Sequence, residues 1–139
     1  MKYACLVYQD PSKLAGMSEA QQLAAIGAAC AVCDAWKVEL EKSGRLVFCA
    51  GLQSLRTAAT VRNVHGKVVM TDGPFAETKE FLGGFTIIEA RDFTEALQIA
   101  SRIASALLTI EVRPVMDADA ELTDPFDRKI AEAAGRRAT

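Results

Sequence analysis

Short apolar runs alternate along this chain with longer segments in which apolar residues recur at helical spacing. Residues 2–8 (KYACLVY) are apolar on both alternations, which is typical of a strand covered on both faces. Residues 46–52 and 85–90 repeat this two-sided pattern, and residues 108–115 form another apolar run. We therefore expect four main strands, of which the first lies in the centre of a sheet.

Two segments between these strands carry the start signals of helices. Ser18 stands three residues before Gln21, which is the spacing of a capping box, and Gly44 suits the left-handed position after a helix end. Asp92 stands in the same relation to Glu95 and opens a second helix. The predicted buried stripes are Leu23, Ile26, Ala29, Cys30, Cys33 and Leu40 in the first helix, and Ala96, Leu97, Ala100, Ile103 and Ala104 in the second.

A hairpin is predicted between the second and third of these strands. Residues 60–64 and 67–71 are β-branched runs separated by His65-Gly66, a two-residue spacing in which glycine supplies a positive φ. The resulting order of elements is that of a ferredoxin-like βαββαβ fold of the α+β class with an inserted β-hairpin. Because both crossovers are right-handed, the two helices lie on one face of the antiparallel sheet. The other face stays bare, so we expect a second copy to cover it in a homodimer.

The length of 139 residues fits one domain, and an apolar share of 50% is ample for one core. The composition turns polar from Asp117, so we expect a domain over residues 1–116 and a C-terminal extension over residues 117–139. Within the extension, Asp124-Pro125 is a start signal for a short helix.

Charge and cysteine content argue against several classes of protein. Sixteen Lys and Arg against 18 Asp and Glu give a net charge of -2 without a block of like charge, so nucleic acid is not expected as a partner. No stretch approaches the ~18 apolar residues of a membrane span, and the N-terminal apolar run is too short for a signal peptide. We therefore expect a cytoplasmic protein without a membrane partner. The four cysteines are expected to be reduced thiols, and we predict no metal and no cofactor.

The most distinctive segment is the loop from Asp72 to Gly84. Asp72 begins a Gly-Pro turn at the end of a strand, where side chains point out of a sheet into clefts. Its carboxylate is expected either to accept a backbone N–H of its own turn or to act as a catalytic base. Arg62 and Arg113, on predicted strands, are candidates to pair with Asp72 or with an acidic ligand. The remaining candidate ligand-binding residues, in a charge pattern that is also typical of a solvated face, are Phe75, Glu77 and Lys79.

The string TDGPFAETKEFLGGF at residues 71–85 is long and unusual, and MKYACLVY at the N-terminus, AGLQ at 50–53 and EVRPVM at 111–116 accompany it in order. With these motifs, residues 1–116 resemble the Asp-Gly-Pro-Phe (DGPF) branch of the YCII-related family. The resemblance implies a dimeric α/β barrel and frequent occurrence beside sigma factors of the extracytoplasmic type. Members of the wider family that are thought to be enzymes resemble proton-transfer lyases. They use a His on the first helix and an Asp near the end of the second, and this chain has neither residue there.

Three functions stay open from the sequence. The leading hypothesis is a small cytoplasmic homodimer that binds a small molecule in a cleft beside the Asp72–Gly84 loop. The second is an accessory or regulatory module that binds a protein and is linked to extracytoplasmic-type sigma factors. The third is a lyase or isomerase in which Asp72 is the base and Arg113 or Lys79 stabilises developing negative charge.

Overall fold

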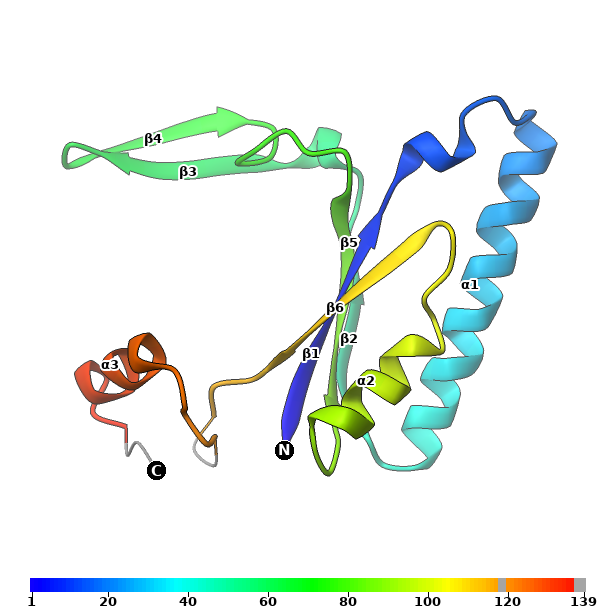
Figure 1. Ribbon diagram of the computed structural model, residues 1–139. Helices are drawn as coiled ribbons and strands as arrows, with labels where there is room; N and C mark the ends of the chain where they lie inside the picture. The colour runs from blue at the N-terminus through cyan, green and yellow to red at the C-terminus, as the bar shows by residue number, and fades with distance from the viewer. Residues whose placement is uncertain (118–119, 137–139) are drawn as a thin grey trace.

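Four antiparallel strands form the main sheet: β1 (Lys2–Gln9), β2 (Leu46–Gly51), β5 (Phe81–Glu89) and β6 (Leu108–Pro114). They lie in the order β2-β5-β1-β6, so β1 is central, as predicted. With one helix between β1 and β2 and another between β5 and β6, this is the expected ferredoxin-like arrangement (Figure 1). The structure, a computed structural model, describes residues 1–117 and 120–136.

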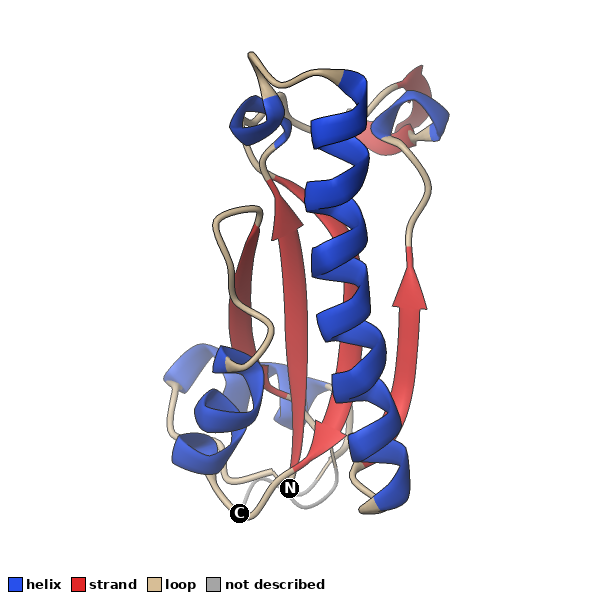
Figure 2. Ribbon diagram, turned by 90° about the vertical axis from the view of Figure 1, so that its right-hand side faces the viewer, coloured by secondary structure: helices blue, strands red, loops and turns tan. Residues whose placement is uncertain are grey.

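Two helices cover one face of this sheet: α1 (Glu19–Lys42) and α2 (Phe93–Ser101) (Figure 2). Ser18 and Gln21 form the predicted capping box, in which Ser18 Oγ accepts the Gln21 N–H at 3.2 Å and Gln21 Oε1 accepts the Ser18 N–H at 2.9 Å. Asp92 accepts the Glu95 N–H at 2.8 Å. After α1, Gly44 has a φ of 72°, which is the left-handed conformation expected there. Both helices therefore begin at the predicted caps.

The core lies between these helices and the sheet. Its buried side chains are Tyr3, Cys5 and Ile88 from the strands, Ala90 after β5, Trp36 and Leu40 from α1, and Ala96, Ile99, Ala100 and Ile103 from α2 and the turn after it. The indole N–H of Trp36 donates to the Ile99 carbonyl at 2.9 Å. This hydrogen bond joins the two helices inside the core.

The N-terminal half of α1 departs from the predicted buried stripe. Leu23 and Ile26 are 65% and 42% exposed, whereas Trp36 and Leu40 are buried. The reason is length: α1 has 24 residues and β1 has 8, which correspond to about 36 Å and about 26 Å. A helical period identifies the apolar side of a helix but not how much of that side a sheet can cover. The uncovered half of α1 forms one wall of a cleft instead.

The face of the sheet opposite α1 and α2 also carries apolar side chains. In the strand register, Ala4 lies beside Ile87 and Leu6 beside Phe85. The rings of Phe48 and Phe85 are 5.8 Å apart, and Phe48 is 54% exposed. We call these five residues the bare face, because neither α1 nor α2 covers them. In Figure 1 the inserted hairpin and the C-terminal segment project on this side of the sheet.

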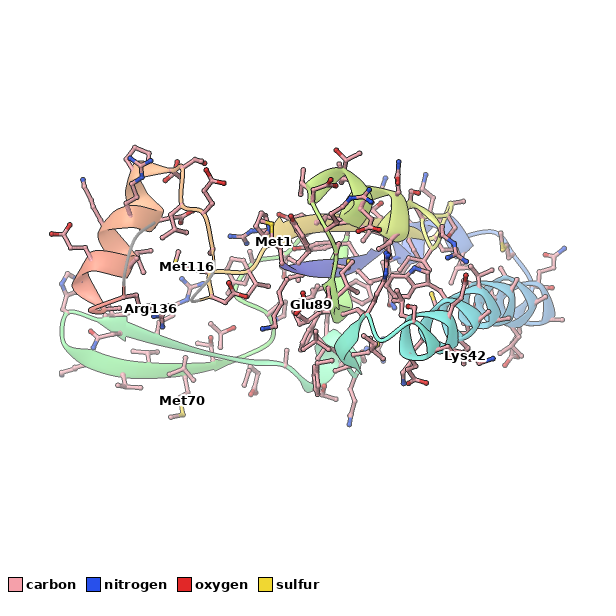
Figure 3. All side chains as sticks on the ribbon, turned by 90° about the horizontal axis from the view of Figure 1, so that it is seen from below. Met1, Lys42, Met70, Glu89, Met116 and Arg136 are labelled. Carbon is pink, nitrogen blue, oxygen red and sulfur yellow. The ribbon has the colours of Figure 1, made fainter. Side chains whose placement is uncertain are left out.

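The hairpin forms a separate two-stranded sheet from β3 (Ala59–Val64) and β4 (Lys67–Asp72). His65 and Gly66 both have positive φ, 51° and 83°, as the predicted two-residue turn requires. Val61, Val68 and Met70 share one face of the hairpin and are 63%, 64% and 74% exposed. In Figure 3, Met70 points away from the rest of the molecule. A hairpin of two strands is marginally stable alone in water, so a surface that covered it would stabilise it.

The C-terminal segment contains a third helix, α3 (Pro125–Ala133), which lies apart from α1 and α2 (Figure 1). Asp124 caps it by accepting the Phe126 N–H at 2.8 Å. Leu122 and Ala131 are buried, whereas Phe126 is 68% exposed. Within residues 1–117 and 120–136, no helix combines the length and the apolar character needed to cross a membrane.

Candidate functional site

A cleft of about 390 Å³ opens beyond the C-terminal end of β1, beside the N-terminal half of α1. Most of its lining is apolar and includes Val7, Leu14, Ile26, Ala29, Phe81, Leu107 and Leu108. The lining also contains the polar residues Gln9, Asp10 and Asp34 and the thiols of Cys30 and Cys33. We call this cavity the Asp10 cleft.

Asp10 is the buried polar residue of the cleft, with 6% of its surface exposed. It caps the short 3₁₀ helix η1 (Pro11–Leu14): its Oδ1 accepts the Ser12 N–H at 3.0 Å and the Ser12 hydroxyl at 2.5 Å. Its Oδ2 lies 3.7 Å from Nζ of Lys79. The Ser12 hydroxyl lowers the pKa of Asp10 and, with the Ser12 N–H and Lys79, outweighs the opposing effect of burial. The carboxylate is therefore negatively charged at neutral pH.

The loop from Asp72 to Gly84 borders this cleft. Lys79 pairs with Asp10, and Phe81 forms part of the apolar wall. Glu80 fastens the loop to the sheet, because its Oε1 accepts the Thr109 hydroxyl at 3.3 Å. The end of the loop thus contributes one cation and one aromatic ring to the Asp10 cleft.

Two glycines at the start of β5 shape the floor next to the cleft. The register between β1 and β5 shifts between Val7 and Tyr8, opposite this point. A Cβ at Gly83 would lie 2.4 Å from the side chain of Gln9, and a Cβ at Gly84 would lie 2.8 Å from the Ala50 carbonyl oxygen. Glycine is required at residue 84, where the close contact is with backbone, whereas at residue 83 the contact is with the flexible end of the Gln9 side chain, which lies across Gly83 beside the cleft.

Cys33, which lines the cleft, is a protonated thiol. Burial raises the pKa of Cys33, and the neighbouring Cys30, Asp34 and Cys49 raise it further. Burial also raises the pKa of Cys5, in the core, to about 11. All four cysteines are free. Across the described part of the chain, no three His, Cys, Asp or Glu side chains are grouped so that they could hold a metal ion.

The Asp72 turn is held by residues of β3. The Thr60 hydroxyl donates to the Gly73 carbonyl at 2.8 Å, and Arg62 Nη2 donates to the Phe75 carbonyl at 2.6 Å. The carboxylate of Asp72 has no hydrogen-bond or ion-pair partner within residues 1–117 and 120–136, so the cap predicted for this turn is not formed. Phe75 is 77% exposed. The predicted residues Arg62 and Phe75 therefore meet each other, and Asp72 joins neither of them through its side chain.

Arg113 lies at a different place from the other candidates. On β6 it is opposite Ala4, and it lines a second cavity of about 580 Å³ between the bare face and the C-terminal segment, together with Lys2 and Leu122. Glu77 is exposed. Of the sequence-predicted site residues, Lys79 reaches the Asp10 cleft, whereas Arg113 lines the other cavity and Asp72 lines neither.

The sequence interpretation missed Asp10 as a site residue. Its cap role has a local signal, since Asp followed by Pro and Ser is typical of a helix start. Its pairing with Lys79, 69 positions later, has none. The same holds for Asp34, which faces the cleft from α1.

The family relationship agrees with the fold. The family model for the YCII-related domain matches residues 1–119. An uncharacterized protein of Rhizobium meliloti (strain 1021) is 35% identical over 118 residues, which cover 83% of this chain and 92% of the relative. With a model match over most of its length and a relative of this similarity, the chain belongs to the YCII-related family.

Proposed function

We propose that this protein binds a small molecule in the Asp10 cleft, beside the Asp72–Gly84 loop. The observation that carries the proposal is the cleft itself, in which apolar walls surround one buried, charged carboxylate. Its volume of about 390 Å³ lies within the usual ~300–1,000 Å³ of small-molecule sites. Apolar walls with a few polar groups that fix orientation are the usual composition of such sites.

Binding is better supported than proton transfer. A general base works best when its pKa is near the working pH, whereas the pKa of Asp10 is lowered from an already acidic value. The Cys33 thiol is a weak nucleophile for the opposite reason, because its pKa is raised. Asp72, the base of the enzymatic hypothesis, does not line the cleft.

The binding form is proposed to be a homodimer. The bare face is an apolar sheet surface that includes a 54% exposed Phe48. A second copy related by a two-fold axis would cover this surface on both chains at once. The Asp10 cleft lies on the helix side of the sheet, so this contact leaves it open.

The binding proposal can be tested by measuring the melting temperature of the protein in the presence of each compound of a metabolite library. A compound that binds only the native state must raise the melting temperature. Ala29→Phe places a large side chain in the cleft, and Ala28→Phe is its matched control because Ala28 is exposed and does not line the cleft. We expect at least one compound that stabilises the wild type and Ala28→Phe but not Ala29→Phe. The proposal fails if every stabilising compound acts equally on Ala29→Phe, or if none stabilises the wild type.

A second candidate function is that of a protein-binding module linked to sigma factors of the extracytoplasmic type; the hairpin favours a protein partner, and the resemblance to the family suggests this one. The hairpin's exposed stripe of Val61, Val68 and Met70 is an apolar surface of the kind that partners cover. Binding of a purified sigma factor of this type, measured by titration calorimetry, should be lost in Met70→Ser and retained in Lys67→Ser. Equal binding by both variants, or no binding by the wild type, would remove this candidate.

A further inference from the structure

The charged side chains that line the Asp10 cleft are all negative. Asp10 and Asp34 line it, and no Lys, Arg or His does so among the described residues. Two cations lie close enough to act on Asp10 from outside the lining: Lys79, which pairs with it from the loop, and Lys13 of the 3₁₀ helix, which forms no ion pair with it. A ligand with a positive charge would therefore meet attraction in the cleft, and a ligand with a negative charge would meet repulsion.

The ion pair between Asp10 and Lys79 is loose and one-sided. The Asp10 side chain is 5% exposed, whereas the Lys79 side chain is 72% exposed. Their charged atoms are 3.7 Å apart, longer than the ~2.7–2.9 Å of a charge-assisted hydrogen bond. Ser12 occupies Oδ1 with two hydrogen bonds, so Oδ2 is the oxygen that is available for a stronger donor.

Replacement of Lys79 by a ligand would cost little. The Lys79 ammonium is already largely in water, so its release requires little further change in its solvation. The entering ammonium group would gain a short hydrogen bond to a buried carboxylate. An apolar body attached to it would at the same time bury surface against Ile26, Phe81 and Leu108.

We propose that the Asp10 cleft selects apolar molecules that carry a primary ammonium group, and that this group replaces Lys79 as the counter-ion of Asp10. The inference rests on the proposed binding function and names the chemical class of its ligand. Lys79 then acts as an internal competitor that occupies the carboxylate until a ligand arrives. Removal of Lys79 should strengthen binding, which distinguishes this role from that of a residue that holds the ligand.

Three indole probes of similar shape test the charge preference: tryptamine as the cation, tryptophol as the neutral analogue and indoleacetate as the anion. Titration calorimetry or ligand-observed NMR gives their dissociation constants. In the wild type, tryptamine should bind at least about tenfold more tightly than tryptophol, as expected for a charge-assisted bond to a buried carboxylate. Indoleacetate should bind more weakly than tryptophol.

Variants then separate the role of each charge. Asp10→Asn should weaken tryptamine by about tenfold or more and leave tryptophol unchanged. Lys79→Gln should tighten tryptamine by about threefold to tenfold, whereas Lys67→Gln, at the hairpin turn, should change nothing. If Asp10→Asn does not fold, Lys79→Gln and the comparison of the three probes decide the question.

The results distinguish a failure of the amine preference from a failure of small-molecule binding in the Asp10 cleft. Suppose that tryptophol or indoleacetate binds more tightly than tryptamine and that Ala29→Phe blocks this binding. The charge preference would then be overturned, but the cleft would still be a small-molecule site. Weaker tryptamine binding in Lys79→Gln would also overturn it, because Lys79 would then hold the ligand. Failure of all three probes overturns the amine preference, and failure of the metabolite library in addition overturns the binding function.

Discussion

Phe48 gives the sharpest test of the proposed homodimer. It exposes 54% of its surface on the bare face, beside the ring of Phe85. An aromatic side chain buries roughly 200 Å² when it is fully covered, so about 100 Å² of Phe48 remains to be buried. At ~25 cal/mol per Å² this contributes about 2.5 kcal/mol per copy and about 5 kcal/mol for a two-fold dimer. Phe48→Ser should therefore raise the dimer dissociation constant by about 10³-fold to 10⁴-fold.

Sedimentation equilibrium over a wide range of concentration measures this change. The wild type should sediment at about twice the chain mass of 14.9 kDa at micromolar concentration, and Phe48→Ser should approach the mass of one chain. Val32→Ser is the matched control, because Val32 is 50% exposed on α1, on the other side of the sheet. A monomeric wild type would refute the argument that the bare face must be covered. A Phe48→Ser variant that is as dimeric as Val32→Ser would show that the chains associate through another surface.

Three further predictions concern substitutions of single residues, at Trp36, Asp72 and Asp10. Trp36→Phe removes the hydrogen bond to the Ile99 carbonyl and part of the core. Calorimetry should therefore show a free energy of unfolding that is lower by about 1–3 kcal/mol, with a lower melting temperature. An unchanged melting temperature would contradict the packing of α1 on α2. Asp72→Ala should change the free energy of unfolding by about 0.5 kcal/mol or less, since its carboxylate has no partner in the described chain, and a larger loss would mean that the carboxylate caps its turn after all. The pKa of Asp10 is lower in the folded than in the unfolded chain, so its contribution to stability is present above pH ~4 and is lost as the pH falls through the folded pKa. Denaturant unfolding should therefore show that the free energy of unfolding falls less for Asp10→Asn than for the wild type when the pH is lowered below ~4. An equal fall in both proteins would contradict the effect of the Ser12 hydrogen bonds.

The parts of the fold that could be predicted are those with local signals. The caps at Ser18 and Asp92 involve residues three positions apart, and the hairpin turn at His65-Gly66 needs two adjacent positive φ values. The two-sided apolar pattern of β1 indicated a central strand because such a strand has neighbours and cover whatever the rest of the fold is. The prediction that Leu23 and Ile26 are buried was wrong, because their burial depends on the length of the sheet, which the sequence of the helix does not contain.

The candidate site was predicted less well, and the Asp72 turn shows why. The short motif indicated the Asp72 carboxylate as the candidate group. In the structure, however, Thr60 and Arg62 donate hydrogen bonds to the backbone carbonyls of Gly73 and Phe75. The likeness to the family could not compensate, since its best-supported pair of catalytic residues has no counterpart here. Of the predicted ligand residues, only Lys79 reaches the Asp10 cleft, and its partner there is the unpredicted Asp10.

The two proposed surfaces make use of the two sides of one sheet. On the helix side, α1 is longer than β1, so its N-terminal half passes beyond the strand and leaves the space that Asp10 and Phe81 border. On the opposite side, the same strands present the bare face, which no part of α1 or α2 reaches. Strand β5 contributes to both sides, because Gly83, across which the Gln9 side chain lies beside the cleft, and Phe85 of the bare face are both residues of β5. A ligand in the cleft and a partner on the bare face would thus act on the same strands from opposite sides, without competing for any surface.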